Sequence, residues 1–277
     1  MREIEGKTLK HIVQYSLKAA LDFLIPRRCI VCERELGISE KHLCQGCLDD
    51  IPHTYYWLRK FNPMADKFNA LIQEELERMS LDGMHHYHVD YSYATALFFY
   101  RADSDYSHIS RQLKYHSNIP AGKFFGQQLG ARLARAEHLA DVDAVIPIPL
   151  HWTRKWSRGY NQAEVIAREV ATALGVDLRA DILERCRRTR TQTKLSIEGK
   201  AANVKGAFRV RPDIVQSSGS GTKKADASAI SDLKHLLIID DIFTTGSTAL
   251  ACYSALRDTF PPSVRISIAT LGFVGEA

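Results

Sequence analysis

Apolar residues follow two different spacings in the larger part of the chain. From Tyr93 onward, short runs rich in β-branched and aromatic residues alternate with longer stretches in which apolar residues recur every three or four positions. The short runs predict buried strands and the longer stretches predict helices, an alternation typical of an α/β fold with a mostly parallel sheet flanked by helices. The predicted strands are residues 95–100, 144–148, 236–239 and 264–270, and the helices between them include residues 124–136, 161–174 and 247–258.

A helical spacing also marks the start of the chain. Apolar side chains recur at three- and four-residue steps from Leu9 to Leu24, immediately ahead of Pro26, which predicts an amphipathic helix. Its apolar face packs within the protein or docks on a partner, and internal packing is the interpretation we favour. Polar residues such as Lys10 and Lys18 interrupt the segment, so it is not an apolar span of about 18 residues, and no signal cleavage site follows it. We therefore expect a cytoplasmic protein without membrane insertion.

Four of the six cysteines lie in one short stretch. Cys29 and Cys32 are followed, after eleven residues, by Cys44 and Cys47, so that both pairs have the same two-residue gap. Such pairs direct two thiolates at one metal, and the intervening loop brings the second pair opposite the first. Disulfides and a redox site are the alternatives, but nothing marks the chain as secreted and no strand-to-helix pattern surrounds either pair. We predict a four-cysteine zinc site, structural because four protein ligands leave no open coordination position.

Length and composition set the number of folded units. The 277 residues are 45% hydrophobic and 25% charged, as in an ordinary soluble globular protein, and the length permits one large and one small unit. We predict an N-terminal helix and zinc-finger module over residues 1–58, a connecting segment over 59–93 and the sheet domain over 94–277. A stretch rich in Ser, Gly, Lys and Ala, at about residues 212–232, predicts a flexible insertion in the sheet domain.

The distribution of charge points to an anionic ligand. The net charge is +5, but residues 150–210 contain thirteen Lys and Arg against six Asp and Glu. A basic segment in an otherwise near-neutral protein favours binding of phosphate esters, pyrophosphate or nucleic acid. The alternative is a solvated basic face.

The strand predicted at residues 236–239 is followed by two acids, a hydroxyl-rich loop and a helix. In open α/β sheets, ligands bind beyond the carboxyl ends of strands. The amides and hydroxyls of this loop would bind a phosphate at the helix N-terminus. The acids would repel a polyphosphate, so they require the vicinal hydroxyls of a sugar, a divalent cation or both. This is the outline of a ribose 5-phosphate site, and its candidate residues are Asp240, Asp241, Thr244, Thr245, Gly246, Ser247 and Thr248.

Two further clusters of cations suit a second anion. One follows the strand predicted at residues 144–148 and surrounds a glycine. The other, at residues 185–194, has no clear periodicity, and it is either a loop that closes over bound substrate or an arm for nucleic-acid phosphates. The candidate anion-binding residues are Arg154, Arg158, Gly159, Arg188, Arg190 and Lys194.

The string LIIDDIFTTGST resembles the signature of the type I phosphoribosyltransferases, which bind 5-phosphoribosyl 1-pyrophosphate (PRPP). Nearly the whole chain resembles the ComF family, which is associated with DNA uptake in bacterial competence. The shared motifs are LDFLIPRRCIVC with the second cysteine pair, LKY at residues 113–115, PIPLHWTRKWSRGYNQA from Pro147, TQTKL from Thr191 and NVKGAF from Asn203. The resemblance implies a phosphoribosyltransferase fold in which Asp240 and Asp241 hold the ribose hydroxyls, residues 244–248 surround the 5-phosphate, and Mg²⁺ accompanies PRPP.

Two functions follow from this resemblance. In the first, the protein transfers phosphoribosyl from PRPP to an acceptor, and no catalytic side chain is assigned because displacement at the anomeric carbon requires no protein nucleophile. In the second, it is a non-catalytic module that binds PRPP or single-stranded DNA for a competence helicase or another DNA-uptake protein. Trp152, Trp156 and Tyr160 lie among basic residues and suit base stacking, although partial burial in the core is the commoner role.

Three histidines, His85, His86 and His88, form one more cluster. Imidazoles are common metal ligands, but no cysteine lies near them at a knuckle spacing. We favour a polar surface loop over a second metal site.

Overall fold

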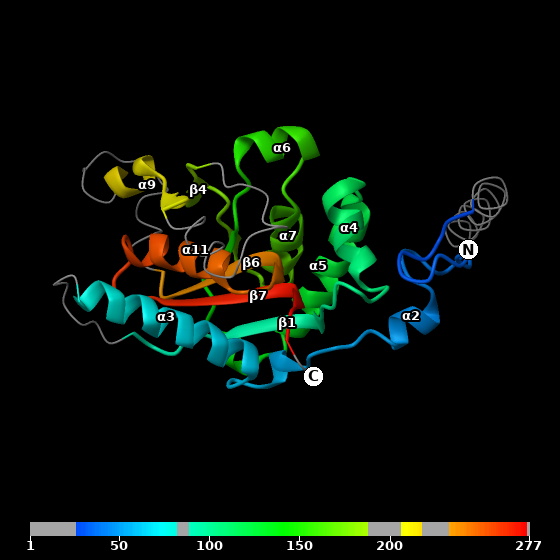
Figure 1. Ribbon diagram of the computed structural model, residues 1–277, viewed down its shortest axis with the longest axis horizontal. Helices are drawn as coiled ribbons and strands as arrows, with labels where there is room; N and C mark the ends of the chain where they lie inside the picture. The colour runs from blue at the N-terminus through cyan, green and yellow to red at the C-terminus, as the bar shows by residue number, and fades with distance from the viewer. Residues whose placement is uncertain (1–25, 82–88, 188–205, 218–232, 276–277) are drawn as a thin grey trace, which may run out of the picture.

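The computed structural model describes residues 26–81, 89–187, 206–217 and 233–275, and it has an α/β fold (Figure 1). Five strands form one sheet in the order β1-β7-β6-β2-β3, and all four neighbouring pairs are parallel. These strands are β1 (Ala94–Phe99), β2 (Ala144–Pro147), β3 (Asp177–Leu178), β6 (His235–Phe243) and β7 (Arg265–Phe273). Two short strands, β4 (Leu183–Arg185) and β5 (Phe208–Val210), pair antiparallel in a separate small sheet.

The sheet is covered by helices on both faces. Along β6, Leu236 and Ile238 belong to one hydrophobic core, whereas Leu237 and Ile239 belong to the other, as the two-residue period of a strand requires. The first core also contains buried residues of α3 (Pro63–Leu81) and α11 (Ser247–Arg257), and the second those of α5 (Ile119–Leu133) and α7 (Gln162–Leu174). Because both faces of the strands are buried, they read as nearly continuous apolar runs.

Helices α5 and α7 pack unusually closely. A Cβ atom on Gly130 would lie 2.8 Å from the Cβ of Ala173, and one on Gly126 would lie 3.1 Å from the carbonyl oxygen of Ile166. The glycines therefore allow the two helix backbones to approach each other. Helix α7 begins after the Asn161 side chain, which accepts a hydrogen bond from the amide of Ala163, and it ends at Gly175 in the left-handed conformation.

The strands and helices predicted from Tyr93 onward are confirmed, with shifted ends. Strand β6 continues four residues past its predicted end because Asp240, Ile242 and Phe243 pair with Thr270, Gly272 and Phe273 of β7. The two acids therefore lie within the strand. The remaining helices are α2 (Gln45–Asp49), η1 (Tyr56–Leu58), α4 (Ser107–Tyr115), η2 (Glu137–Leu139), α6 (Trp152–Arg158) and α9 (Pro212–Ser217).

The cysteine segment packs against the second core. Ile30, Val31 and Leu43 are buried in the cluster that contains the inward side chains of α4 and α5. The hydroxyl of Tyr106, next to α4, donates a hydrogen bond of 2.9 Å to the carbonyl of Cys47. These contacts join the segment to the sheet domain, and the unit boundaries at residues 58 and 93 stay predictions.

Several sequence-based expectations fall on residues outside the described part. They are the amphipathic helix at residues 9–24, the three histidines at 85, 86 and 88, and most of the predicted insertion, whose first residues form α9. Within the described ranges, no helix combines the length and apolar character needed to cross a bilayer.

Candidate functional site

The loop from β6 to α11 turns sharply at Gly246. Its φ of +83° lies in the left-handed region, and an added Cβ would come within 2.5 Å of Leu71 Cδ1 and 2.7 Å of Phe243 Cζ. Glycine is thus required by both the backbone and the packing beneath the loop. Lys67 of α3 donates a hydrogen bond of 2.9 Å to the carbonyl of Thr244 and holds the loop from the other side.

Backbone donors of this loop are left for a ligand. The amide of Ser247 donates to the Thr245 hydroxyl at 3.4 Å, and the Thr245 and Ser247 hydroxyls lie 2.9 Å apart. Among the residues described, the amides of Gly246, Thr248 and Ala249 have no acceptor. They belong to the first turn of α11, where amides lack intrahelical partners and the helix dipole favours an anion. The loop can therefore bind an anion through its backbone.

The two acids at the end of β6 face different surroundings. Successive residues of a strand point to opposite faces, and Asp241 turns toward α4, where its Oδ2 lies 2.7 Å from Lys114 Nζ and 3.4 Å from the Ser110 hydroxyl. Asp240 accepts a hydrogen bond of 2.8 Å from the amide of Asp241. Burial, and then the negative charge of Asp241, raise the pKa of Asp240 to about 7. Near neutral pH, this carboxyl can hold or release a proton.

Lys114 also lines this region, although no sequence pattern predicted a role for it. It belongs to the LKY motif, which carries the family resemblance without indicating a role. Burial alone would lower the pKa of Lys114, but the ion pair and hydrogen bond with Asp241, together with the charge of Asp240, keep the pKa above its ordinary value. The ammonium group therefore stays charged and compensates one of the two acids.

A cavity of about 640 Å³ joins these groups to the turn between α6 and α7. Asp240, Asp241, Thr244 and Thr248 line it from the β6 side, and Arg158 lines it from the turn. The two sequence motifs predicted to bind phosphate and pyrophosphate thus meet in one space at the carboxyl ends of the strands. Further lining residues are Tyr100, Lys114, Tyr115, Ser117, Ile148, Leu150, Asn161, Gln162, Ala163, Arg185 and Ile242.

Not every predicted residue lines this cavity. Gly246 borders a small adjacent hollow of about 20 Å³, while Thr245 and Ser247 belong to the loop itself. Gly159 supplies a positive φ of +77° to the turn after α6. Arg154 lies in α6, although its side chain is outside the described part, as are the residues Arg188, Arg190 and Lys194.

Two tryptophans of α6 are exposed, which corrects the expectation of partial burial. Trp152 is 71% exposed and Trp156 is 87% exposed, whereas Tyr160 is buried. Tyr115, at the end of α4, is also exposed, and the Arg158 guanidinium lies 5.7 Å from its ring centre. The exposed ring of Tyr115 therefore lies beside the Arg158 guanidinium at the border of the cavity.

The four cysteines form one cluster, as predicted. Their sulfur atoms all lie within 4.8 Å of one another, and Cys32 Sγ is 3.7 Å from Cys44 Sγ. Tetrahedral zinc with Zn–S bonds of about 2.3 Å places its sulfurs about 3.8 Å apart, so the cluster fits this ion. The amide of Cys47 donates to Cys44 Sγ at 3.4 Å, and against the effect of burial such hydrogen bonds lower the pKa of Cys44 to about 6. The arrangement can hold a zinc ion in a closed site.

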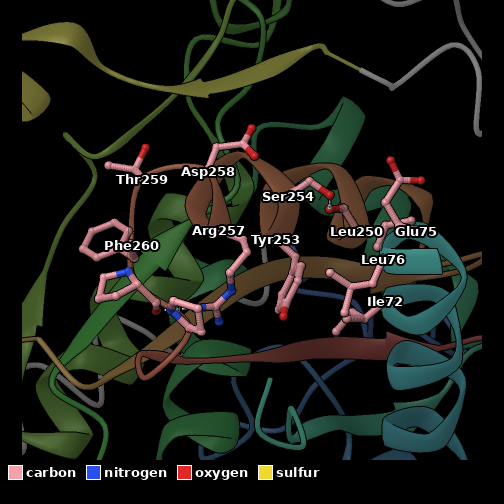
Figure 2. Close-up of a pocket in the computed structure, with 12 residues that line it drawn as sticks. Ile72, Glu75, Leu76, Leu250, Tyr253, Ser254, Arg257, Asp258, Thr259 and Phe260 are labelled. Atoms are coloured by element: carbon pink, nitrogen blue, oxygen red, sulfur yellow. Dashed lines mark hydrogen bonds between the residues drawn. The ribbon is translucent and has the colours of Figure 1, made fainter. Parts of the chain in front are cut away.

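A second cavity, of about 460 Å³, lies between α3 and α11 (Figure 2). Ile72 and Leu76 line it from α3, and Leu250 and Tyr253 line it from α11. Its walls are mostly apolar, and none of the predicted site residues lines it. The predicted site residues that line a large cavity, such as Asp240, Asp241 and Arg158, all line the first one.

Known proteins were compared with the full chain. No family model matches it. Competence protein F of Haemophilus influenzae is 26% identical over 236 residues, which cover 83% of this chain and 90% of that protein. The chain is a homologue of competence protein F. The resemblance to the ComF family drawn from its motifs is thereby confirmed.

The chain is also similar, over shorter stretches, to a second group of proteins. DNA utilization protein YhgH of Salmonella typhi is 32% identical over 114 residues, 41% of this chain and 43% of that protein. The protein of the same name from Escherichia coli strain K12 is 29% identical over 106 residues, 38% of this chain and 39% of that protein. The chain matches less than half the length of each YhgH protein.

Proposed function

We propose that this protein binds PRPP as its Mg²⁺ complex in the cavity at the end of β6 and acts in DNA uptake during natural transformation. The observation that carries the proposal is that the acid pair and Arg158 line one space of about 640 Å³, and that the unused amides of the loop border this space or the small hollow next to it. Each part matches one part of PRPP, namely the 5-phosphate, the ribose diol and the pyrophosphate. The names of the relatives, which refer to competence and DNA utilization, support the biological role.

The 5-phosphate would bind the loop at residues 244–248. Amides of Gly246, Thr248 and Ala249 would donate to phosphate oxygens, and the Thr244 and Thr248 side chains border the same space. Asp240 and Asp241 would accept hydrogen bonds from the ribose hydroxyls, which are donors that a carboxylate can use. Lys114 lowers the charge repulsion between this acid pair and the phosphates.

The pyrophosphate would lie toward the turn after α6. Arg158 lines that side of the cavity, and we propose that Arg154, Arg188, Arg190 and Lys194 add further positive charge. Mg²⁺ would neutralise part of the pyrophosphate charge. If the protein is a phosphoribosyltransferase, an acceptor atom bonds to the anomeric carbon while the bond to pyrophosphate breaks, and pyrophosphate leaves with that electron pair. The cations would stabilise this leaving group.

A non-catalytic module that binds single-stranded DNA is the second candidate. It is favoured by the exposed rings of Trp152 and Trp156 on α6 and by the exposed Tyr115 ring beside Arg158, because aromatic rings among cations stack bases along a strand. Such a module would serve a competence helicase or another DNA-uptake protein. The double variant Trp152→Ala with Trp156→Ala should weaken binding of an oligo-dT probe in fluorescence anisotropy, and wild-type affinity should fall steeply with salt.

Calorimetric titration tests the main proposal. Wild-type protein should bind PRPP with Mg²⁺, and the double variant Asp240→Asn with Asp241→Asn should not. The double variant Asp103→Asn with Asp105→Asn is a matched control, since it removes two acids outside the cavity lining. Equal affinity in the wild type and in the double variant at residues 240 and 241 would refute the assignment. Release of pyrophosphate with a candidate acceptor would separate the enzyme from the non-catalytic module.

A further inference from the structure

Helix α4 presents two polar side chains to the acid pair from one face. Ser110 and Lys114 are four residues apart, so they lie on the same side of the helix, and both approach Asp241 Oδ2. Ile109 and Leu113 are buried in the second core. The position of the Lys114 ammonium group therefore depends on how the last turn of α4 is held.

That last turn is held by two side chains from a distant part of the chain. The carbonyl of Leu113 accepts hydrogen bonds from the Tyr160 hydroxyl and from Gln162 Nε2, the latter at 3.2 Å. Carbonyls in the last turn of a helix lack intrahelical partners, so an outside donor fixes them. Tyr160 and Gln162 are both buried, which excludes competition by solvent.

The segment from the end of α6 to the start of α7, which carries Tyr160 and Gln162, also contains Arg158, the residue proposed to bind pyrophosphate. Arg158 Nη1 donates a hydrogen bond of 3.1 Å to Gln162 Oε1, and the Ser117 hydroxyl donates one of 3.2 Å to the carbonyl of Arg158. A continuous path of hydrogen bonds thus runs from Arg158 through Gln162 to Leu113. Lys114, the next residue in the chain after Leu113, forms the ion pair with Asp241.

We infer that Tyr160 and Gln162 are positioning residues, which fix Lys114 against Asp241 through the carbonyl of Leu113. The geometry of this clamp stands by itself, while its importance for PRPP rests on the function proposed above. Tyr160 and Gln162 of the segment PIPLHWTRKWSRGYNQA then act through the LKY motif, and both side chains are bonded to protein groups. Without the clamp, the last turn of α4 loosens, Lys114 leaves Asp241, and the acid pair repels phosphate more strongly.

Lysine labelling tests the clamp without any ligand. The protein is treated briefly with acetic anhydride, and the acetylation rates of Lys114 and Lys123 are compared by mass spectrometry. An ammonium group held in an ion pair reacts slowly, so Tyr160→Phe and Gln162→Leu should each raise Lys114 labelling several-fold and leave the exposed Lys123 unchanged. Tyr91→Phe, which removes a hydroxyl bonded to Asp66, is the control and should change neither rate. Thermal melting verifies that each variant is folded.

A double-mutant cycle distinguishes positioning from general loosening. Asp241→Asn should also raise Lys114 labelling, and adding Tyr160→Phe to it should give no further increase, because the ion pair is already lost. Wild-type labelling of Lys114 in the folded Tyr160→Phe, Gln162→Leu double variant would overturn the inference.

Ligand binding then tests the link to the proposed function. With PRPP and Mg²⁺, the single variants should bind about 3- to 10-fold more weakly than the wild type, as expected for one lost hydrogen bond. Failure of the wild type to bind PRPP would refute the proposed function but leave the labelling result and the clamp intact. Raised Lys114 labelling with unchanged PRPP affinity would refute the role of the clamp in binding.

Discussion

Lys114 Nζ lies 2.7 Å from Asp241 Oδ2, so that one of two adjacent acids is neutralised by a lysine 127 positions earlier in the sequence. The other acid, Asp240, has no such ion pair in the described part of the chain, and its pKa is raised to about 7 by burial and by the charge of Asp241. The pair is therefore asymmetric. Because the pKa of Asp240 is raised toward neutrality, we expect the free energy of unfolding to depend on the ionisation of this acid.

Ionisation of Asp240 should destabilise the fold. The native pKa is higher than the unfolded one, so the native state binds more protons and the free energy of unfolding falls as pH rises from about 4 to about 7. Urea unfolding of the wild type and of Asp240→Asn at several pH values measures this. The wild type should lose stability relative to the variant over that range. Parallel pH profiles for the two proteins would contradict the raised pKa.

Replacement of Gly246 by alanine should damage both stability and binding. The left-handed backbone and the approach of Leu71 and Phe243 together should cost about 1–3 kcal/mol of unfolding free energy. Gly175→Ala is the matched control, because Gly175 has φ +70° but nothing within 4 Å of an added Cβ. Denaturant unfolding should show a larger loss for Gly246→Ala. Only that variant should lose PRPP affinity, and equal effects of both would count against the packing beneath the loop.

Removal of zinc from the cysteine cluster should destabilise the whole protein. Residues of the cysteine segment are buried in the same core as α4 and α5, so the segment cannot loosen without exposing apolar surface. Elemental analysis should find one zinc per chain, and a chelator should lower the Tm. Cys32→Ser should lose the zinc, whereas Cys186→Ser, outside the cluster, should keep it. A zinc content near zero in the wild type would remove the assignment.

His235 should make the fold sensitive to acid. Its ring is buried between Asp141, at 2.7 Å, and the Ser267 hydroxyl, at 2.8 Å. Burial lowers the pKa of His235, although Asp141 partly offsets this, so the native state favours the neutral ring. The unfolded state takes up the proton first as pH falls below about 6.5, and stability decreases there. His235→Gln should flatten the dependence between pH 5 and 7, and exposed His116→Gln should not. An unchanged slope in His235→Gln would contradict this.

The sheet and the loop from β6 to α11 could be predicted from sequence because their signals are local. Continuous apolar runs such as LLII identify buried strands, and the string of acids, hydroxyls and glycine identifies a strand-to-helix turn. The extension of β6 through Asp240 and Asp241 could not be predicted, since acids are poor strand formers and only pairing with β7 holds them there.

Long-range contacts account for what the sequence did not reveal. The role of Lys114 depends on the packing of α4 against the end of β6, and a nine-residue helix carries no mark of its distant partner. The exposure of Trp152 and Trp156 likewise depends on tertiary structure, because aromatic residues near a strand end occur both in cores and on surfaces. By contrast, the cysteine cluster was predicted because its spacing already brings the thiolates together.

A crystal structure of the protein with PRPP and Mg²⁺ tests the central claim most directly. We expect the 5-phosphate to accept hydrogen bonds from the amides of Gly246, Thr248 and Ala249, with both ribose hydroxyls on Asp240 and Asp241. An empty loop in crystals that contain the ligand elsewhere, or loop amides bonded to protein acceptors instead, would contradict the claim.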